Sequence, residues 1–206
     1  MKELLRRYPI LEECSESIEA ASSKMIECYK NGGKILICGN GGSSADGDHI
    51  VGELMKGFLK KRPLSEEKKK EMKAKWELDD DLLSKLQCGL PAISLSSITA
   101  LNSAFCNDVD PSLMYAQCVM GLAKENDILI AISTSGNSKN VAAAARVARS
   151  LGVTVIGLTG HKGGALLDIS DICIRVPETE TYKVQELHLP VYHYLCAAVE
   201  AYFFKA

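Results

Sequence analysis

Residues 34–58 read KILICGNGGSSADGDHIVGELMKGF, and this stretch determines the fold expected of the whole chain. Its first five residues, KILIC, are almost wholly apolar and lie between two glycine-rich turns, as is typical of a parallel strand covered on both faces. From Ser44 the apolar residues follow helical spacing instead. The stretch therefore predicts a strand, a tight turn and a helix, an arrangement that binds anions because free N–H groups of the first helical turn point at the ligand.

The turn lacks the motifs of the common nucleotide-binding loops. It contains no Gly-Lys-Ser or Gly-Lys-Thr sequence, and its glycines do not have the spacing of the dinucleotide-binding fingerprint. It offers the neutral side chains Asn40, Ser43 and Ser44 instead. Their amide and hydroxyl groups suit the hydroxyls of a sugar or the oxygens of a phosphate.

Two potential metal ligands follow in the expected helix. His49 and Glu53 are four residues apart and lie about 40° apart on one helical face, so both can reach a single metal ion or substrate. Taken alone, this spacing is more typical of an exposed ion pair on a helix surface. The two residues become a candidate site only together with signals elsewhere in the chain.

The composition is that of an ordinary globular protein. The 206 residues suit one domain, residues 1–206, with 47% apolar and 24% charged residues. The formal net charge of −2 argues against nucleic acid or an anionic membrane as the main partner. The sequence contains no apolar run long enough to span a bilayer and no signal or transit peptide, and its eight cysteines form no Cys-x-x-Cys motif. We therefore expect a cytoplasmic protein with reduced, buried cysteines.

Four further strands are expected at residues 90–95, 127–132, 153–158 and 171–176, with helical sequence before the third and fourth strands of the chain and a turn at residues 159–164 before the fifth. Strands that alternate with helices predict right-handed crossovers and parallel pairing. The expected fold class is therefore α/β, with a doubly wound, mainly parallel five-stranded sheet of the flavodoxin-like type, flanked by helices. Residues 2–29 predict a long amphipathic helix, interrupted at Pro9, that packs on the outside of the domain or on another subunit.

Residues 60–89 form a charged insertion that contains Trp76, the only tryptophan. Ser65 is suited to cap a helix that opens with Glu66 and Glu67. Positive and negative charges are mixed along the segment. This favours a solvent-exposed helical insertion over a segment that binds a partner. A helix-to-strand connection lies at the opposite end of an α/β sheet from the ligand, so the insertion is poorly placed to be a lid over its own site, although it can touch a neighbouring subunit.

A second polar turn follows the expected strand at residues 127–132. It reads STSGNS, residues 133–138, and leads into an alanine-rich helix over residues 140–151. One Ser or Thr would suffice to cap that helix. Four hydroxyl groups and a glycine favour a phosphate-binding turn without lysine.

The last helix, residues 181–204, places polar side chains on an otherwise apolar ribbon, and such groups need partners when buried. Among them, Glu186 and His193 are seven residues apart and best aligned, whereas Gln185 and His193 differ by about 80°. Pro190 removes one helical hydrogen bond and can bend the helix, so spacing alone does not choose between the two pairs. Hydrogen bonds across an oligomer interface would satisfy the same side chains.

Four motifs occur in this order along the chain: ILICGNGGSSADGDHIVGEL, AISTSGNSKNV, VIGLTGHKGG and VQELHLPVYH. Together they closely resemble the sugar isomerase (SIS) domain and, within it, the phosphoheptose isomerases, which convert sedoheptulose 7-phosphate to D-glycero-D-manno-heptose 7-phosphate. The resemblance covers most of the chain apart from residues 60–89. It implies the SIS fold, an aldose–ketose isomerase and a homotetramer with sites built at subunit interfaces.

The resemblance also implies which residues form the site. Those implied to contact the sugar phosphate are Asn40, Gly41, Gly42, Ser43, Glu53, Asn107, Asp108, Ser133, Thr134, Ser135, Ser138 and Gln185. One zinc ion per subunit is implied at His49, Glu53, Gln185 and His193, with Glu53 and His193 doubling as the acid/base pair. A carboxylate and an imidazole suit proton transfer between C1 and C2 through an enediol, although a carboxylate cannot be both a tight zinc ligand and a free base.

Two features depart from the pattern of that family. The charged insertion is one, and Tyr182-Lys183 stands where an acidic and a basic residue are expected before the glutamine. Alternative functions are a non-catalytic SIS scaffold that binds a replication initiator, a sensor of sugar phosphates, or an isomerase of another phosphosugar. Retention of both Glu53 and His193 favours an enzyme, because a scaffold does not need them.

Overall fold

The computed structural model describes residues 1–204 and contains one sheet of five strands in the order β2-β1-β3-β4-β5. Every neighbouring pair of strands is parallel, so the predicted five-stranded α/β sheet is confirmed. The predicted strand positions hold to within two residues at each end. The strands are β1 (Ile35–Cys38), β2 (Ala92–Ser94), β3 (Ile128–Ser133), β4 (Thr154–Gly160) and β5 (Ile172–Val176).

The order of the strands creates a crevice at the centre of the sheet. From β1 the chain first adds β2 on one side and then returns to add β3 on the other, with Ile35 opposite Ile128 and Cys38 opposite Ala131. All residues of β1 and β3 are buried, which explains why both strands are continuous apolar runs. Ligands of open α/β sheets bind beyond the carboxyl ends of strands at such a reversal, here between β1 and β3.

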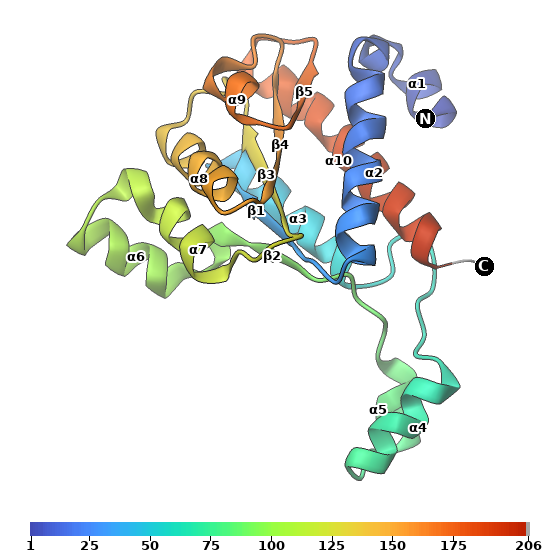
Figure 1. Cartoon of the computed structure of the whole chain (residues 1–206). Coiled ribbons are helices and arrows are strands. Elements are labelled where there is room, and N and C mark those ends of the chain that lie inside the picture. Colours follow the sequence, from blue (N-terminus) through green and yellow to red (C-terminus); the bar gives the residue numbers. More distant parts are fainter. Residues whose placement is uncertain (205–206) are drawn as a thin grey trace.

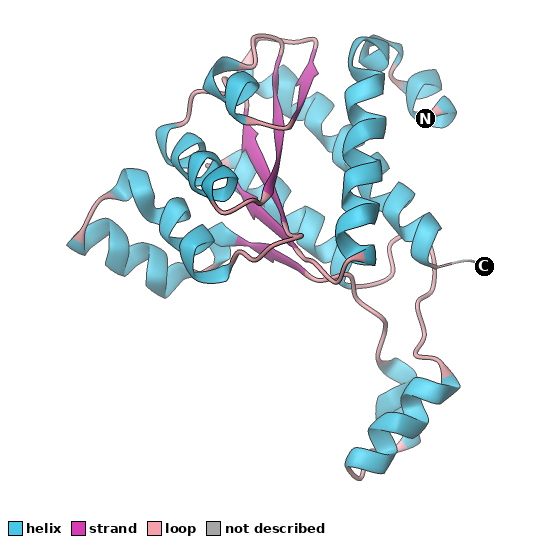
Figure 2. Ribbon diagram, in the orientation of Figure 1, coloured by secondary structure: helices cyan, strands magenta, loops and turns pink. Residues whose placement is uncertain are grey.

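Helices cover both faces of the sheet (Figures 1 and 2). On one face α2 (Ser15–Lys30), α3 (Gly42–Met55) and α10 (Thr181–Phe203) enclose one apolar core with the sheet. On the other face α7 (Met114–Leu122), α8 (Lys139–Ser150) and α9 (Gly164–Ile169) enclose the second core. The remaining helices are α1 (Lys2–Arg7), η1 (Pro9–Cys14), α4 (Glu66–Lys75), α5 (Asp80–Lys85), η2 (Leu95–Ser97), α6 (Thr99–Asp108) and η3 (Pro111–Leu113).

The N-terminal helix is interrupted at Pro9, as predicted, but its packing was predicted wrongly. After α1 and η1, helix α2 turns its apolar side chains into the core rather than lying on the outside of the domain. Ile18, Ala21 and Met25 have no exposed surface, and α2 packs against α10 and β5. The reason is that α3 and α10 alone leave part of this sheet face uncovered, and the apolar stripe of α2 fills it.

The charged insertion forms helices α4 and α5, which extend away from the sheet (Figure 1). Ser65 caps α4 as predicted, because its Oγ accepts a hydrogen bond from Lys68 N at 3.1 Å. Trp76 is 75% exposed. The two chain segments that join the insertion to the body pair at its base through an antiparallel bridge between Pro63 and Gln87.

The eight cysteines are all unpaired within the described residues, and five of them are buried. Burial raises the pKa of Cys14 to about 11 and that of Cys196 to about 12, so these thiols stay protonated at neutral pH. The five buried cysteines therefore act as small core residues, as predicted from the sequence. In residues 1–204 no helix has both the length and the apolar character needed to cross a membrane.

Candidate active site

The first polar turn lies at the carboxyl end of β1 and leads directly into α3. Ser43 N and Ser44 N donate to the carbonyl oxygens of Asn40 and Gly41, each at 3.0 Å, which folds the chain tightly at this point. Gly41 has φ +55° and ψ −122°, a conformation that favours glycine. The turn thus presents the start of α3 towards the crevice between β1 and β3.

The second polar turn lies beside the first, at the carboxyl end of β3. Ser133 Oγ is 3.0 Å from Ser138 Oγ, and Ser135 Oγ accepts a hydrogen bond from Asn137 N at 3.2 Å. Ser138 occupies the N-cap position of α8, but its hydroxyl makes no capping hydrogen bond. Hydroxyls and free amides therefore gather at the start of α8, the arrangement that binds a phosphate.

A pair of amides joins the two turns. Asn40 Nδ2 donates to Asn140 Oδ1 at 2.8 Å, and Asn140 Nδ2 donates back to Asn40 Oδ1 at 2.9 Å. Asn140 was not predicted to belong to the site. Its only signal was a polar side chain in the first turn of an otherwise alanine-rich helix.

Three predicted site residues come together between α3 and α10. His49 Nε2 lies 3.2 Å from Glu53 Oε1, and the ring centroids of His49 and His193 are 5.0 Å apart. Two buried atoms of this group, Glu53 Oε2 and His193 Nε2, have no hydrogen-bond partner among the described residues, although Lys56 Nζ forms an ion pair with Glu53 Oε2 at 3.6 Å. Burial and the neighbouring His49 lower the pKa of His193, so its imidazole is neutral at pH 7.

Two further residues hold His49 in place. Tyr192 Oη lies 3.0 Å from His49 Nδ1 and donates to Asp46 Oδ1 at 3.3 Å. Burial raises the pKa of Asp46 above its ordinary value. Both residues were missed from the sequence, because a tyrosine on an apolar helix face and an aspartate in the first turns of a helix are common structural features.

Gln185 lies apart from these three residues. A Cβ atom at Gly42 would be 2.4 Å from Gln185 Nε2, so the glutamine side chain covers the start of α3. Along α10 it is eight residues, or about 12 Å, from His193. Within residues 1–204, no three or more His, Cys, Asp or Glu side chains are assembled in a geometry that could hold a metal ion.

The predicted donors nevertheless suit zinc chemically. Imidazole and carboxylate groups are typical zinc ligands, and a metal ion would give partners to Glu53 Oε2 and His193 Nε2. His49 and Glu53 face each other already. The residues present therefore fit the ion, although the side chains are not gathered around a single point.

Asn107 and Asp108 lie elsewhere. They form the last turn of α6, where Asn107 Nδ2 donates to Asp108 Oδ1 at 2.8 Å, and both are exposed. Helix α6 packs against α7, on the sheet face opposite α3 and α10 (Figure 1). The structure therefore does not bring these two residues to the Glu53–His193 pair of the same chain.

A groove opens beside His193. Its volume is about 500 Å³, and its walls come from the N-terminal segment, the segment after α3 and the middle of α10. Arg7, Tyr8, Phe58 and Pro190 are among the lining residues. No motif in the sequence indicated that residues before the first strand border the site.

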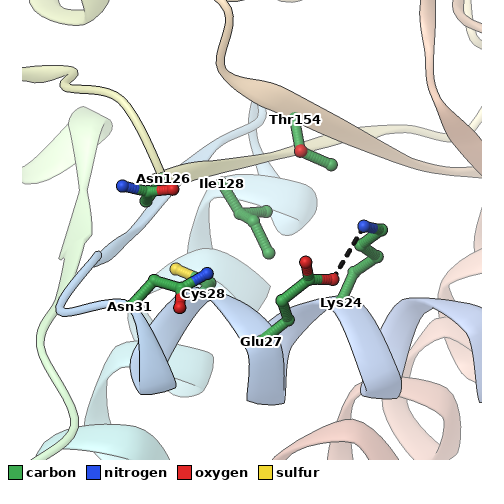
Figure 3. Close-up of a pocket in the computed structure, with 7 residues that line it drawn as sticks. All are labelled: Lys24, Glu27, Cys28, Asn31, Asn126, Ile128 and Thr154. Atoms are coloured by element: carbon green, nitrogen blue, oxygen red, sulfur yellow. Dashed lines mark hydrogen bonds and ion pairs between the residues drawn. The ribbon is translucent and has the colours of Figure 1, made fainter.

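A second, much smaller pocket lies at the amino end of the sheet (Figure 3). It is bordered by Lys24 and Glu27 of α2, which form an ion pair at 2.7 Å, and by the first residues of β3 and β4, Ile128 and Thr154. Its volume of about 60 Å³ is too small for a sugar phosphate. None of the predicted site residues lines it.

The parallel sheet with two polar turns at its central crevice is that of a SIS domain protein. SIS domain family models match residues 1–74 and 100–200, and the unmatched stretch between them includes the second half of the insertion. Curated relatives include the phosphoheptose isomerase of Aneurinibacillus thermoaerophilus, which is 36% identical over 94% of this chain and 85% of its own length. The phosphoheptose isomerase of a Nitratiruptor species is 38% identical over 98% of this chain and 97% of its own length.

Solved structures give the same result. The phosphoheptose isomerase GmhA from Neisseria gonorrhoeae has a TM-score of 0.76 and 30% identity, covering 97% of this chain and 94% of its own. A phosphoheptose isomerase from Francisella tularensis has a TM-score of 0.77 and 33% identity, covering 94% and 90%. The chain belongs to the phosphoheptose isomerase family.

Proposed function

We propose that this protein is an aldose–ketose isomerase that converts sedoheptulose 7-phosphate to D-glycero-D-manno-heptose 7-phosphate in the cytoplasm. The observation that carries the proposal is the grouping of Glu53 with His193 across α3 and α10, each with a buried polar atom that lacks a hydrogen-bond partner among residues 1–204. Buried polar atoms are usually satisfied, so two unsatisfied ones in one group favour a ligand there. The family relationship supports the same reaction.

The two residues suit the two proton transfers of the reaction. Isomerisation moves a proton between C1 and C2 and relocates another between the two oxygens. Glu53 Oε2 has no hydrogen-bond partner in the described part of the chain and can take the proton from carbon, while Oε1 is oriented by His49. His193 is neutral at pH 7 and can donate to one sugar oxygen and accept from the other.

Zinc is proposed as a cofactor, held by His49, Glu53, Gln185 and His193. When bound, it would polarise the sugar carbonyl and stabilise the negative charge of the enediolate. Gln185 would have to leave the start of α3 to join the other three residues, because it now packs against Gly42. Alternatively, it stays there and contacts the sugar.

The phosphate is expected at the second polar turn. Ser133, Thr134, Ser135 and Ser138 stand in the turn that leads into α8, with the hydroxyls of Ser133 and Ser138 3.0 Å apart, and the first amides of α8 carry the positive end of the helix dipole. Asn40 and Ser43 of the first turn face the same crevice and suit the sugar hydroxyls. In this proposal the phosphate anchors the substrate and the sugar chain extends towards the acid/base pair.

The separation between the start of α3 and Glu53 supports sites that are shared between subunits of the proposed homotetramer. Glu53 is eleven residues along α3 from Gly42, a rise of about 16 Å, which is longer than a seven-carbon sugar phosphate between its reacting carbon and its phosphorus. The start of α3, which lies beside the phosphate turn, is therefore too far along the helix from Glu53 of the same subunit for one substrate molecule to reach both. In the proposed assembly, the pair of one subunit meets the phosphate turn of another.

Turnover of sedoheptulose 7-phosphate by the purified protein tests the proposal. The assay is run as purified, after chelation and with zinc restored, and with the His193→Ala variant as a control. Isomerisation that zinc restores and the variant lacks would support both the reaction and the site. Tight binding of sugar phosphates without turnover would overturn the reaction and favour a sensor or a different phosphosugar.

A further inference from the structure

Arg62, at the base of the insertion, is a buried guanidinium. Its side chain has no exposed surface, in contrast to the exposed Lys61 before it. Nη1 donates to the carbonyl oxygen of Leu54 at 2.6 Å, and Nη2 donates to that of Glu53 at 3.1 Å. Nε donates to Glu200 Oε1 at 2.8 Å. Arg62 therefore joins the end of α3, where Glu53 lies, to Glu200 near the end of α10, the helix whose middle carries His193.

The partner carboxylate is equally buried and fully hydrogen-bonded. Glu200 accepts from the backbone N–H groups of Phe58 and Leu59 at 2.8 Å and of Lys60 at 3.1 Å, in addition to Arg62. Burial alone would raise the pKa of Glu200, but these donors outweigh it and hold the pKa below its ordinary value. The Glu200 carboxylate thus holds residues 58–62, the segment that follows α3.

Arg62 acts as the cap of α3. The last carbonyl groups of a helix have no partners within the helix, and a glycine in the left-handed region often supplies them. Helix α3 has no such cap, because Lys56 follows it in extended conformation. The guanidinium supplies two of the missing donors and also compensates the negative end of the helix dipole.

The hydrogen bonds of Arg62 and Glu200 form a network next to the candidate acid/base pair, Glu53 and His193. Glu53 is two residues from the end of α3, in the turn whose carbonyls Arg62 holds. Glu200 is seven residues after His193 and therefore on the same face of α10. Phe58, whose N–H binds Glu200, places its ring 5.5 Å from the ring of His193.

We propose that Arg62 and Glu200 are positioning residues that set the distance between Glu53 and His193. The inference rests on the proposed isomerase function. An arginine is required because its planar fork reaches two carbonyls and one carboxylate at once, which a lysine ammonium cannot do. Small displacements of reacting groups are costly in catalysis, so loosening the network acts mainly on the chemical step.

The test compares Arg62→Lys with Lys34→Met. Lys34 forms a second largely buried ion pair, with Asp127 at 2.5 Å, at the amino end of the sheet and away from α10. Lys34→Met removes the ion pair with Asp127, whereas Arg62→Lys keeps a positive charge beside Glu200 and loses the planar fork that reaches the two carbonyl groups. Only Arg62→Lys is expected to lower kcat, by about ten- to a hundredfold, with KM changed less than about threefold. An unchanged kcat in folded Arg62→Lys, or an equal loss in Lys34→Met, would overturn the proposal.

Amide hydrogen exchange gives a readout that does not require turnover. Exchange in the peptide covering residues 49–58 is expected to speed up by about fivefold or more in Arg62→Lys and to stay unchanged in Lys34→Met. Unchanged exchange in Arg62→Lys would overturn the network even if the wild-type protein proved not to be an isomerase. Glu200→Gln, which keeps the shape of the side chain and loses its charge, repeats both measurements if Arg62→Lys does not fold, with the same expected and overturning results.

Discussion

The side-chain amides of Asn40 and Asn140 donate to each other's oxygen at 2.8 and 2.9 Å, and this pair fixes the two polar turns of the crevice relative to each other. Each asparagine uses one N–H for the partner and keeps the other for a ligand. Among residues 1–204, the second N–H of Asn140 has no acceptor. We therefore expect the pair to contribute to the proposed substrate site as well as to its framework.

Replacing Asn140 by Ala is expected to raise KM for the phosphosugar about tenfold and to leave kcat within about twofold, because one hydrogen bond to a charged ligand contributes roughly 1–2 kcal/mol. Steady-state kinetics and the thermal shift with sugar phosphate measure this. Arg146→Ala, an exposed position further along α8, is the matched control. A loss of kcat with KM unchanged would place Asn140 outside substrate binding.

Replacing Glu53 by Gln is expected to reduce turnover by at least about a thousandfold, since the amide cannot accept the proton from carbon. The fold and the binding of phosphosugar should persist, because the side chain keeps its shape and the phosphate turn is remote. Circular dichroism and thermal shift check both. Glu186→Gln, the same substitution at an exposed position on α10, serves as the control. Near-normal turnover in Glu53→Gln would remove Glu53 from the reaction.

Acidification is expected to destabilise the protein through His188. This imidazole is completely buried, both of its nitrogens lack hydrogen-bond partners within residues 1–204, and burial lowers its pKa to about 4. The unfolded chain binds the proton near a pH of about 6.5, so stability is unaffected by this group above that value and falls as the pH drops from there towards 4.

Between pH 7.5 and pH 5 the loss from His188 is about 2 kcal/mol of unfolding free energy. Urea unfolding at the two pH values measures it in the wild type and in His188→Leu. The variant should show a pH dependence smaller by that amount, since the other titrating groups are shared. Equal pH dependence in both proteins would mean that His188 does not titrate in this range.

Removing the insertion between Pro63 and Gln87 is expected to leave kcat within about twofold. The bridge between these two residues already brings the ends together, so a two-residue Gly linker closes a tight turn. The boundary matters, because a deletion that starts at Arg62 removes the buried guanidinium and should lose most activity. Kinetics and size-exclusion chromatography compare the two deletions. If the deletion between Pro63 and Gln87 loses activity while it keeps its fold and assembly, α4 and α5 are part of the site.

Gly136→Ala is expected to destabilise the protein by about 2 kcal/mol or more. Gly136 has φ +69°, and an added Cβ would lie 1.8 Å from the carbonyl oxygen of Gly163, so the second polar turn would have to move. Gly121→Ala on α7 is the control, because nothing in the described structure lies within 4 Å of its Cβ position. Thermal unfolding measures both, and a similar Tm for the two variants would contradict the crowding at Gly136.

The sheet was predictable from the sequence because its strands are buried on both faces. Residues 35–38 and 128–132 are continuous apolar runs with polar turns after them, and the structure places both strands in the interior of the sheet. The short helix α9 was missed, since its six residues after Gly163 make fewer than two helical turns and cannot show a helical period. The packing of α2 was missed because amphipathicity shows that a face is buried but not against which element.

The candidate site was predictable where residues share one helix. His49 and Glu53 follow from a spacing of four, and the structure brings them within 3.2 Å. The position of Gln185 against Gly42 depends on how α10 lies along α3, which no periodicity encodes. The burial of Arg62 was not predicted for a different reason. Arg62 follows two lysines in a segment whose charges otherwise face solvent.

The order of the strands also determines when the crevice can form during synthesis of the chain. Ile35 of β1 pairs with Ala92 on one side and Ile128 on the other, so the first strand has no sheet partner until β2 has left the ribosome, and its central position is completed only by β3. Pairings between such distant residues fold slowly. During translation the apolar β1 strand therefore depends on α2 and α3 for protection, and nascent chains that stall before residue 128 should be the ones that chaperones retain.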